Sequence, residues 1–380
     1  MAPGRIRVLQ IMHGPAAPFG ELARLYAGAF DPERCELLTL FLTGAPDREL
    51  AERFPGQVRF LEFPGRRLCG LKLALIRYLL RLHREFPFRL VIAHRYKALY
   101  SALLAGFWLP PVRVIGVAHA FGVLERGARR ALLWLLRSRV YLLGVSQAVA
   151  EDLQRGAPFL GPERVAALPN GLDLEALLAA QVPPQKARAE LGLEEASFVF
   201  ASIGRYHPDK DQAGMLRAFA RAAPEMPGAQ LLLIGAGRLR PALEAQVRDL
   251  GLEGRARLVG PIPGAARLLP GCDVYCSSSD REPFGLVLTE AMAARLPVIS
   301  SDCGGAPEVL GARGRYFRRG DDAALAAQML ALYRMPAAER LELGEALFQR
   351  LAQEFTPEAF RHRLLGLPMI ADWVGRSDAG

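Results

Sequence analysis

Residues 277–309 read SSSDREPFGLVLTEAMAARLPVISSDCGGAPEV, and this stretch decides the fold class. It starts at the end of an apolar run, passes through a loop with Glu282, and continues into a helix-period segment that carries Glu290. A second apolar run, Val298–Ser301, follows. Strand, helix and strand in this order are typical of a parallel sheet that is buried on both faces. Because ligands bind outside the carboxyl ends of such strands, we expect this loop to face a ligand.

The same alternation runs through the whole chain of 380 residues. The strands expected in the first half are Ile6–Met12, Leu37–Leu42, Val58–Phe63, Leu90–Ala93, Val112–Ala118, Val140–Val145 and Val165–Leu168. Those expected in the second half are Phe198–Ile203, Gln230–Ile234, Ala256–Val259, Asp273–Ser277 and Val298–Ser301. The pattern predicts an α/β protein with two doubly wound, Rossmann-like domains, residues 1–182 and 183–354, followed by a C-terminal helix and tail, residues 355–380.

The positive charge is confined to the first of these domains. Residues 1–182 hold 24 basic and 15 acidic residues, whereas residues 183–380 hold 24 of each. Such asymmetry indicates an anionic partner, which could be nucleic acid, a membrane surface or an acidic substrate. Nucleic acid is the remote alternative, because no recognition module or aromatic stacking pattern accompanies the charge.

Composition excludes several other classes of protein. The hydrophobic share of 51% excludes a disordered chain, and no repeat suggests collagen or a coiled coil. Five scattered cysteines predict no disulfide framework and fit a reducing compartment. We find no signal-peptide pattern, and the longest uncharged apolar run, Ala98–Val112, is shorter than the roughly 20 residues that span a bilayer. We therefore expect a cytoplasmic protein.

A second motif, SIGRYHPDK at Ser202–Lys210, follows the first strand of the second domain. Gly204 allows a ligand to approach the backbone closely, and Arg205 and Lys210 supply two cations that suit a diphosphate. Lys210 is one of only four lysines in a chain with 44 arginines, so codon bias explains it poorly. The alternative is an ordinary basic surface loop.

The carboxylates of Glu282 and Glu290 suit sugar hydroxyls, which donate hydrogen bonds to carboxylate oxygens. The N-terminus of the helix between them offers free N–H groups to an anion such as phosphate. The alternative is that Glu282 only caps the helix and that Glu290 is solvated.

Together these motifs resemble the retaining glycosyltransferases of the GT-B fold, the group 1 or GT4 family. The family's E-x7-E element is Glu282–Glu290, and its flanking patterns are ALPNG at 167–171, GRYHPDK at 204–210, LLIGAG at 232–237, LVGPI at 258–262 and CGGAPEV at 303–309. The resemblance covers nearly the whole chain. It implies a cleft between two Rossmann-like domains and a C-terminal helix that crosses back to the first domain.

The resemblance also implies a role for each candidate residue in binding a nucleotide-diphosphate sugar, for which we expect UDP. Arg205 and Lys210 bind the diphosphate, and Glu290 binds the ribose. Glu282 binds the donor sugar, close to the N–H groups of Phe284, Gly285, Leu286 and Val287. The backbone at Pro261 and Ile262 faces the base. The donor-binding set therefore comprises Gly20, Gly204, Pro261, Ile262, Phe284, Gly285, Leu286, Val287 and Glu290, beside the catalytic candidates His119, Arg205, Lys210 and Glu282.

In the first domain, His13, His94 and His119 each close an expected strand. His119 matches the family histidine that lies near the donor sugar, although each ring alone is more often structural. The family pairs two glycines in the first loop, whereas here the glycines are split by prolines, and Gly20 is the expected contact. The family also has glycine where this chain has Arg295. A metal trio of histidines lacks a carboxylate, and the resemblance implies neither metal nor cofactor.

The implied reaction is transfer of a hexose to an acceptor hydroxyl with retention, by front-face attack. The acceptor is expected to be an envelope glycan or lipid-linked glycan, with the lipopolysaccharide core as leading candidate. Two basic, leucine-rich segments, Arg66–Arg89 and Arg126–Arg139, would dock on the anionic inner leaflet, or their leucines would face the core and their arginines the solvent. The alternatives are another GT-B enzyme such as a nucleotide-sugar epimerase, or a non-catalytic subunit bound to the membrane surface.

Overall fold

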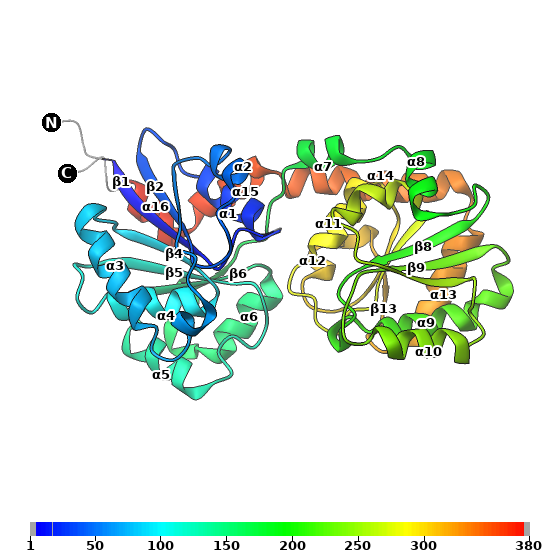
Figure 1. The fold of residues 1–380 in the computed structure, drawn as a ribbon, viewed down its shortest axis with the longest axis horizontal. Coiled ribbons are helices and arrows are strands. Elements are labelled where there is room, and N and C mark those ends of the chain that lie inside the picture. The colour runs from blue at the N-terminus through cyan, green and yellow to red at the C-terminus, as the bar shows by residue number, and fades with distance from the viewer. Residues whose placement is uncertain (1–4, 17, 376–380) are drawn as a thin grey trace. The chain divides into compact units, whose positions relative to one another are not determined.

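The computed structural model describes residues 5–16 and 18–375 of the chain (Figure 1). The end of the expected tail, 376–380, lies outside them. Contacts divide the chain into two compact units. Unit 1 takes the described residues up to Leu172 and those from Phe355 on, and unit 2 is Asp173–Glu354.

Unit 1 is built on a sheet of seven parallel strands in the order β3-β2-β1-β4-β5-β6-β7. Its strands are β1 Ile6–Met12, β2 Cys35–Phe41, β3 Gln57–Phe60, β4 Leu90–His94, β5 Arg113–Ala118, β6 Val140–Gly144 and β7 Val165–Ala167. Its helices are α1 Phe19–Gly28, α2 Arg48–Glu52, α3 Leu73–Glu85, α4 Arg95–Ala105, α5 Gly127–Leu135, α6 Gln147–Gly156, α15 Pro357–Gly366 and α16 Pro368–Gly375. The strand order reverses between β1 and β4.

Unit 2 repeats this topology with six parallel strands in the order β10-β9-β8-β11-β12-β13. Its strands are β8 Phe198–Ile203, β9 Ala229–Ile234, β10 Ala256–Gly260, β11 Val274–Ser277, β12 Val298–Ser301 and β13 Arg315–Phe317. Its helices are α7 Leu174–Ala180, α8 Pro184–Leu191, α9 Gln212–Ala222, α10 Arg240–Asp249, α11 Leu286–Ala293, α12 Ala306–Leu310, α13 Asp322–Arg334 and α14 Ala337–Glu354. Here the order reverses between β8 and β11.

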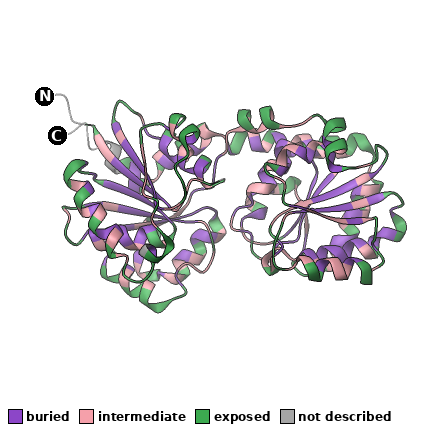
Figure 2. Cartoon of the chain, viewed as in Figure 1, coloured by how far each residue is buried: buried purple, intermediate pink, exposed green. Residues whose placement is uncertain are grey.

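Both units therefore have the doubly wound architecture that the continuous apolar runs predict, and all twelve expected strands are present. Helices cover both faces of each sheet, which explains why the central strands are buried almost throughout (Figures 1 and 2). The edge strands β3, β7, β10 and β13 are partly exposed. The thirteenth strand, β13, escapes sequence reasoning because it is only three residues long and begins with an arginine.

The division between the units falls ten residues before the expected boundary at residue 182. Residues 173–182 belong to unit 2 because α7 packs against α11. In addition, the N–H of Val182 donates to the carbonyl of Arg267. The tandem prolines at 183–184 begin α8 and do not mark the domain boundary.

The C-terminal segment packs on unit 1 through two helices. In α15 the Phe360 ring lies 4.8 Å from the Tyr26 ring of α1, and the N–H of Leu172 donates to the carbonyl of Phe355. The expected single helix is interrupted because Leu367 has an extended backbone, and Pro368 starts α16. No helix in the described part of the chain is long and apolar enough to cross a membrane.

Arg295, which replaces the glycine expected from the resemblance, still adopts the left-handed backbone with φ of 55°. Glycine would occupy that region without strain. The arginine is retained there by an ion pair with Glu345 at 2.8 Å and by its guanidinium, which lies 3.7 Å from the centre of the Phe348 ring. Both partners come from α14. The turn at Arg295 therefore keeps the expected left-handed conformation and is held against α14 by these two contacts.

Candidate active site

The predicted residues of unit 2 gather where the sheet order reverses, at the carboxyl ends of β8 and β11. Ligands of open α/β sheets bind at this position because the two flanking loops diverge and leave a crevice. The loop after β8 is tied to the loop after β11 by the Ser278 hydroxyl, which donates to the carbonyls of Lys210 and Asp211, both at 2.9 Å. The N–H of Asp280 donates to the carbonyl of Asp209. The loops are therefore held in one arrangement.

Lys210 and Glu282 form the central ion pair of this site. The Nζ of Lys210 lies 2.7 Å from Oε2 of Glu282, and the Ser279 hydroxyl donates to the same oxygen at 3.2 Å. Glu282 is only 5% exposed, so its charge needs this partner. Sequence reasoning singled out both residues but did not pair them, because 72 positions separate them.

Glu282 is also fixed through its backbone. Its carbonyl accepts a hydrogen bond from the N–H of Gly305, in the loop after β12. The Ser301 hydroxyl and the Cys303 thiol both donate to the carbonyl of Ser279. The CGGAPEV motif thus supports the loop that carries Glu282.

Arg205 and Lys210 occupy the same loop but have different surroundings. Arg205 is 73% exposed in its side chain and makes a loose ion pair with Asp209 at 3.6 Å. The Lys210 side chain is 21% exposed and committed to Glu282. The site therefore has one cation held in a close ion pair, Lys210, and one that is largely exposed to solvent, Arg205.

Glu290 lies on α11 and is mostly buried. Burial raises the pKa of its carboxyl to about 7. No hydrogen bond ties this carboxyl to another residue that the structure describes. Gly285, with φ of 94°, stands at the N-cap of α11 without a side-chain cap. Glu282 therefore does not cap this helix, and Glu290 is only partly exposed to solvent.

Phe284, Gly285, Leu286 and Val287 form the entrance to α11. Phe284 and Gly285 are buried, whereas Leu286 and Val287 are partly exposed. Because no side chain caps the helix, its first N–H groups remain available to an anion. Val287 lines a small pocket together with Gly204 and Lys210.

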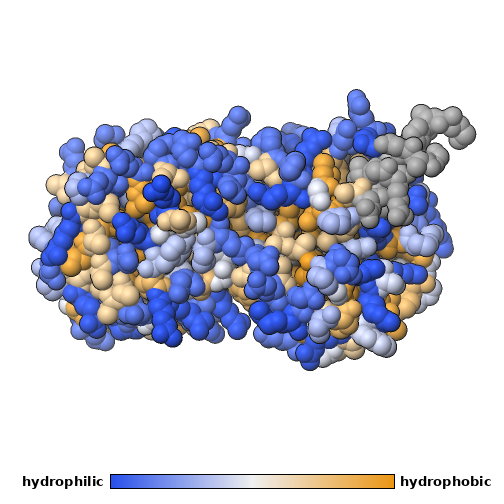
Figure 3. Space-filling view, turned by 180° about the vertical axis from the view of Figure 1, so that it is seen from behind, coloured by the Kyte–Doolittle hydropathy of each residue, from blue (hydrophilic) through white to orange (hydrophobic). Residues whose placement is uncertain are grey.

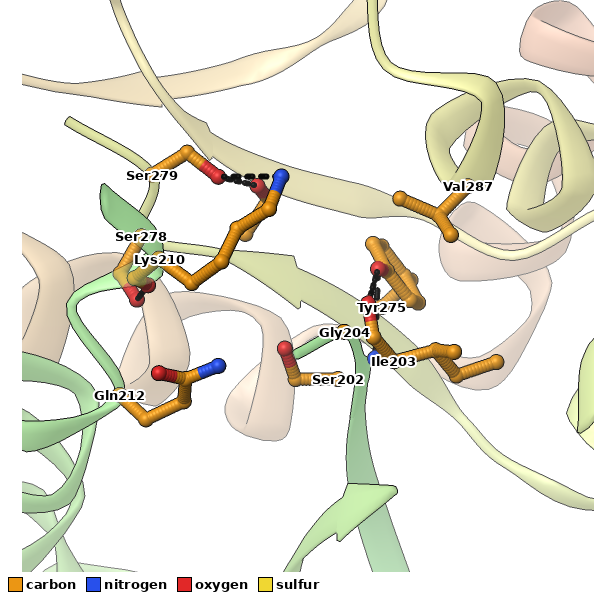
Figure 4. A pocket seen from close by; sticks show the side chains of 10 residues that line it. Ser202, Ile203, Gly204, Lys210, Gln212, Tyr275, Ser278, Ser279 and Val287 are labelled. Carbon is orange, nitrogen blue, oxygen red and sulfur yellow. Dashed lines mark hydrogen bonds between the residues drawn. The ribbon is translucent and has the colours of Figure 1, made fainter. Parts of the chain in front are cut away.

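Figure 4 shows this pocket, with Lys210 pointing toward Ser279 and Gln212 lying across from Ser202. Gln212 donates to the carbonyl of Arg205 at 2.8 Å, while its Oε1 is buried and has no hydrogen-bond partner. Sequence reasoning missed Gln212 and Ser279. Their only signal was a polar residue at the end of a strand or at the start of a helix.

The two glycines of the LLIGAG motif, Gly235 and Gly237, pack against the loop after β8. A Cβ on Gly235 would collide with the carbonyl of Gly204, and one on Gly237 with the backbone of Tyr206. These glycines therefore allow the loops after β8 and β9 to pack together. By contrast, a Cβ on Gly204 would meet only the side chains of Lys210 and Gln212, at 3.9–4.0 Å, so nothing inside the protein requires glycine there.

Pro261 and Ile262 follow β10, two strands away from β8. Pro261 is exposed and Ile262 is partly exposed. The preceding carbonyl, of Gly260, accepts a hydrogen bond from the N–H of Gly235. This bond connects the Pro261 loop to the β9 loop and, through it, to Gly204.

His119 and Gly20 lie in unit 1. His119 follows β5, and its Nε2 lies 3.0 Å from Nδ1 of His94, at the end of β4. Burial lowers the pKa of His119 to about 3, and Arg95 acts in the same direction. His13, at the end of β1, also has a lowered pKa because of burial, Arg95 and Lys97.

Gly20 has a structural reason to be glycine. It is buried in α1, where a Cβ would collide with the carbonyl of Pro15 and meet Leu50. Among the described residues, no group of three or more histidines, cysteines or carboxylates is placed to hold a metal ion.

Two family models match the chain. Residues 184–350 match the family described as "Glycosyl transferases group 1", and residues 34–176 match "Glycosyltransferase Family 4". Together the two matches cover most of both units.

Curated relatives share about a third of their matched residues. N-acetyl-alpha-D-glucosaminyl L-malate synthase of Bacillus anthracis is 31% identical over 173 residues, which are 45% of each chain. The lipopolysaccharide core biosynthesis glycosyltransferase LpsD of Rhizobium meliloti is 33% identical over 186 residues, 48% of this chain and 53% of that protein. The matched region thus spans about half the length of these relatives.

Solved structures match over nearly the whole chain. Anabaena HepE in complex with UDP and glucose has a TM-score of 0.77 at 21% identity, covering 95% of this chain and 98% of that one. A glycosyltransferase from Rickettsia africae has a TM-score of 0.79 at 14% identity, covering 95% and 97%. At these identities the likeness establishes the fold.

Proposed function

This chain belongs to the group 1 glycosyltransferases, and we propose that it moves a hexose from a UDP-sugar to a hydroxyl of a glycan or lipid-linked acceptor. The observation that carries the proposal is the buried Lys210–Glu282 pair between the β8 and β11 loops. It places a cation beside the uncapped N-terminus of α11, at the edge where ligands bind. UDP complexes of the structural neighbour HepE support UDP as the nucleotide.

In this proposal each residue contacts the group that its chemistry suits. Lys210 and the exposed Arg205 stabilise the negative charge that grows on the departing diphosphate, and the N–H groups at the start of α11 add to this field. Glu290 accepts hydrogen bonds from the ribose hydroxyls. The free Oε1 of Glu282 binds a hydroxyl of the donor sugar, while the backbone at Pro261 and Ile262 reads the base.

We also propose retention by front-face attack, with no metal or cofactor. A double displacement uses two carboxylates about 5–5.5 Å apart, one of them a nucleophile. Lys210 and Ser279 both bind Oε2 of Glu282, and the charge that they draw from this carboxylate weakens its remaining oxygen, Oε1, as a nucleophile. The diphosphate would instead take the acceptor proton, and the two cations would balance its charge. The anomeric configuration of the product, read by NMR, tests this route.

Thermal unfolding with a panel of UDP-, GDP- and ADP-sugars tests the donor. Only the cognate nucleotide sugar is expected to stabilise the protein, by about 2.7 kcal/mol at a concentration 100-fold above its Kd. A panel in which no nucleotide sugar raises Tm contradicts the proposal. An incubation with the cognate nucleotide sugar but without acceptor then distinguishes a glycosyltransferase from a nucleotide-sugar epimerase. Only the epimerase would yield an epimer of the sugar under these conditions.

We propose an anionic acceptor presented at the inner face of the cytoplasmic membrane, with the lipopolysaccharide core as the first candidate. The similarity to LpsD supports this acceptor. On the face drawn in Figure 3, hydrophobic residues lie scattered among hydrophilic ones. Of the large hydrophobic side chains exposed in the described residues, all but Leu341 lie in unit 1, namely Leu71, Leu73, Phe107, Trp108, Trp134 and Leu135.

The two basic segments bury most of their leucines and leave a few large apolar side chains exposed. Leu75, Leu79 and Leu82 of α3 are buried, so most of this leucine face serves the core. Leu71 and Leu73 are exposed beside Lys72, and Trp134 and Leu135 are exposed at the end of α5. Exposed apolar residues among arginines suit the surface of an anionic bilayer.

Binding to anionic vesicles tests the membrane proposal. Phosphatidylglycerol vesicles are expected to bind the protein at low salt and to release it at high salt. The double variant Leu71→Ser/Leu73→Ser should weaken binding, whereas Leu341→Ser, which removes an equally exposed leucine from unit 2, should not. Equal binding to neutral vesicles, or equal loss in both variants, contradicts this docking surface.

A further inference from the structure

Four polar side chains lie in line across the centre of the unit 1 sheet. Thr39 of β2, Gln10 of β1, His94 of β4 and His119 after β5 come from four strands that are consecutive in the sheet. Gln10 and Thr39 are fully buried and His94 is nearly so. Apolar side chains would fill these positions without the cost of burying polar groups.

Each member of this row is hydrogen-bonded to the next. The Thr39 hydroxyl donates to Oε1 of Gln10 at 3.0 Å, and Nε2 of Gln10 lies 3.2 Å from Nε2 of His94. Nδ1 of His94 lies 3.0 Å from Nε2 of His119, with the ring planes within 17° of parallel. Thr39 and Gln10 are also register partners in the sheet, which fixes the start of the row.

The orientation of the Gln10 amide determines which atom donates and which accepts in each hydrogen bond of the row. Its Nε2 also lies 3.9 Å from the thioether sulfur of Met12, which can accept but not donate. Both hydrogens of the amide nitrogen therefore have acceptors, Met12 and His94. Because Nε2 of His94 accepts, its proton is on Nδ1, which donates to Nε2 of His119. The remaining proton of His119 is then on Nδ1.

The neutral state of both rings agrees with this direction. Burial is the main cause that lowers the pKa of both His94 and His119, and the neighbouring Arg95 adds to it. A charged His119 would also turn its Nε2 into a donor that faces the N–H of His94. The row therefore disfavours protonation of His119 as well as its other tautomer.

We propose that Thr39, Gln10 and His94 form a hydrogen-bond relay that holds His119 as the neutral Nδ1–H tautomer, so that unit 1 presents a fixed N–H donor to a substrate oxygen. That the substrate is a nucleotide sugar rests on the proposed function, whereas the tautomer does not. His119 follows a central strand at the carboxyl edge of the sheet, and its Nδ1 makes no hydrogen bond to any residue that the structure describes. Gln10 and His94 are thus positioning residues, which act through His119.

The tautomer is measured directly on the full chain by NMR with 15N-labelled histidine, since there are only six histidines to resolve. His119→Asn identifies the His119 signals. In the wild-type protein, His94 and His119 are expected to carry the proton on Nδ1 between about pH 5 and 8. A proton on Nε2 of His119, or titration of its ring in that range, overturns the relay without any variant.

Gln10→Leu removes the amide at nearly constant volume and should let His119 populate both tautomers. Gln230→Leu is the matched control, because Gln230 lies on strand β9 of unit 2, outside the relay. Thr39→Val should weaken the bias in the same way at a second position, and Thr39→Ser, which keeps the hydroxyl, should restore it. If Gln10→Leu does not fold, the two Thr39 variants still test whether the relay sets the tautomer of His119.

Turnover of the cognate nucleotide sugar links the tautomer to function. Gln10→Leu is expected to lower kcat/KM about fivefold, the value of one net hydrogen bond, with the Kd for UDP unchanged. If UDP does not bind the wild-type protein, the proposed function fails while the NMR result stands. If UDP binds but Gln10→Leu alters neither tautomer nor turnover, the relay is overturned.

Discussion

Lys210→Met is expected to lower kcat by about 10²–10³-fold, the effect of removing one preorganised group that stabilises charge in a transition state. Methionine keeps the length of the aliphatic stem but removes the cation next to the proposed diphosphate. The same change leaves the buried carboxylate of Glu282 without its partner at 2.7 Å. Loss of one member of a buried pair costs about 3–5 kcal/mol, so the variant should also be less stable.

A double variant separates these two effects. Lys210→Met/Glu282→Gln removes both charges, and the glutamine can still accept a hydrogen bond from Ser279. Stability measured by urea unfolding should return most of the way to that of the wild type, while kcat stays low. Recovery of turnover together with stability would show that Lys210 only supports the fold. A matched change outside the site, Lys186→Met in α8, should affect neither quantity.

Glu290→Gln is expected to remove a strong pH dependence of stability. The pKa of Glu290 is raised from 4.5 to about 7 by burial, so between these values the folded protein binds a proton that the unfolded chain has released. The wild type therefore loses stability relative to the variant as pH rises through this window. The difference should grow by about 2–3 kcal/mol between pH 5 and 8, measured by urea unfolding at both values. A difference that stays constant with pH would contradict the buried acid.

The same variant tests the ribose contact. The ionised carboxylate accepts hydrogen bonds from hydroxyls more strongly than an amide does, so the variant should bind UDP about 10- to 100-fold more weakly at pH 8. The loss should shrink below pH 7, where Glu290 of the free wild type becomes protonated. Calorimetry at both pH values measures this. The titration of the phosphates is common to both proteins and cancels in the ratio of their affinities.

Much of the site could be predicted because its motifs lie at strand ends. The apolar runs placed β8 and β11, and their loops then had to carry Gly204, Lys210 and Glu282. The expectation that Gly20 contacts the donor depended only on the resemblance to a family that has paired glycines in the first loop. In the structure this glycine is required by its contact with the Pro15 carbonyl, which no spacing in the sequence reveals.

The relay illustrates what sequence patterns miss. Thr39 and Gln10 interrupt apolar runs by one residue each, and such interruptions carry no signal of their own. They become meaningful only when β2, β1, β4 and β5 lie next to one another and the four side chains share one face.

By itself, the sequence determined the two α/β domains, the strands and the loops that carry the motifs, because burial on both faces of a parallel sheet requires continuous apolar runs. It also determined which residue types stand at the strand ends. Only the tertiary structure decided that Lys210 neutralises Glu282, that Glu290 is buried enough to hold its proton near neutral pH, and that His119 is fixed by its neighbours. These properties depend on distances between residues far apart in the chain and on exclusion of water, both of which arise only when the strands assemble.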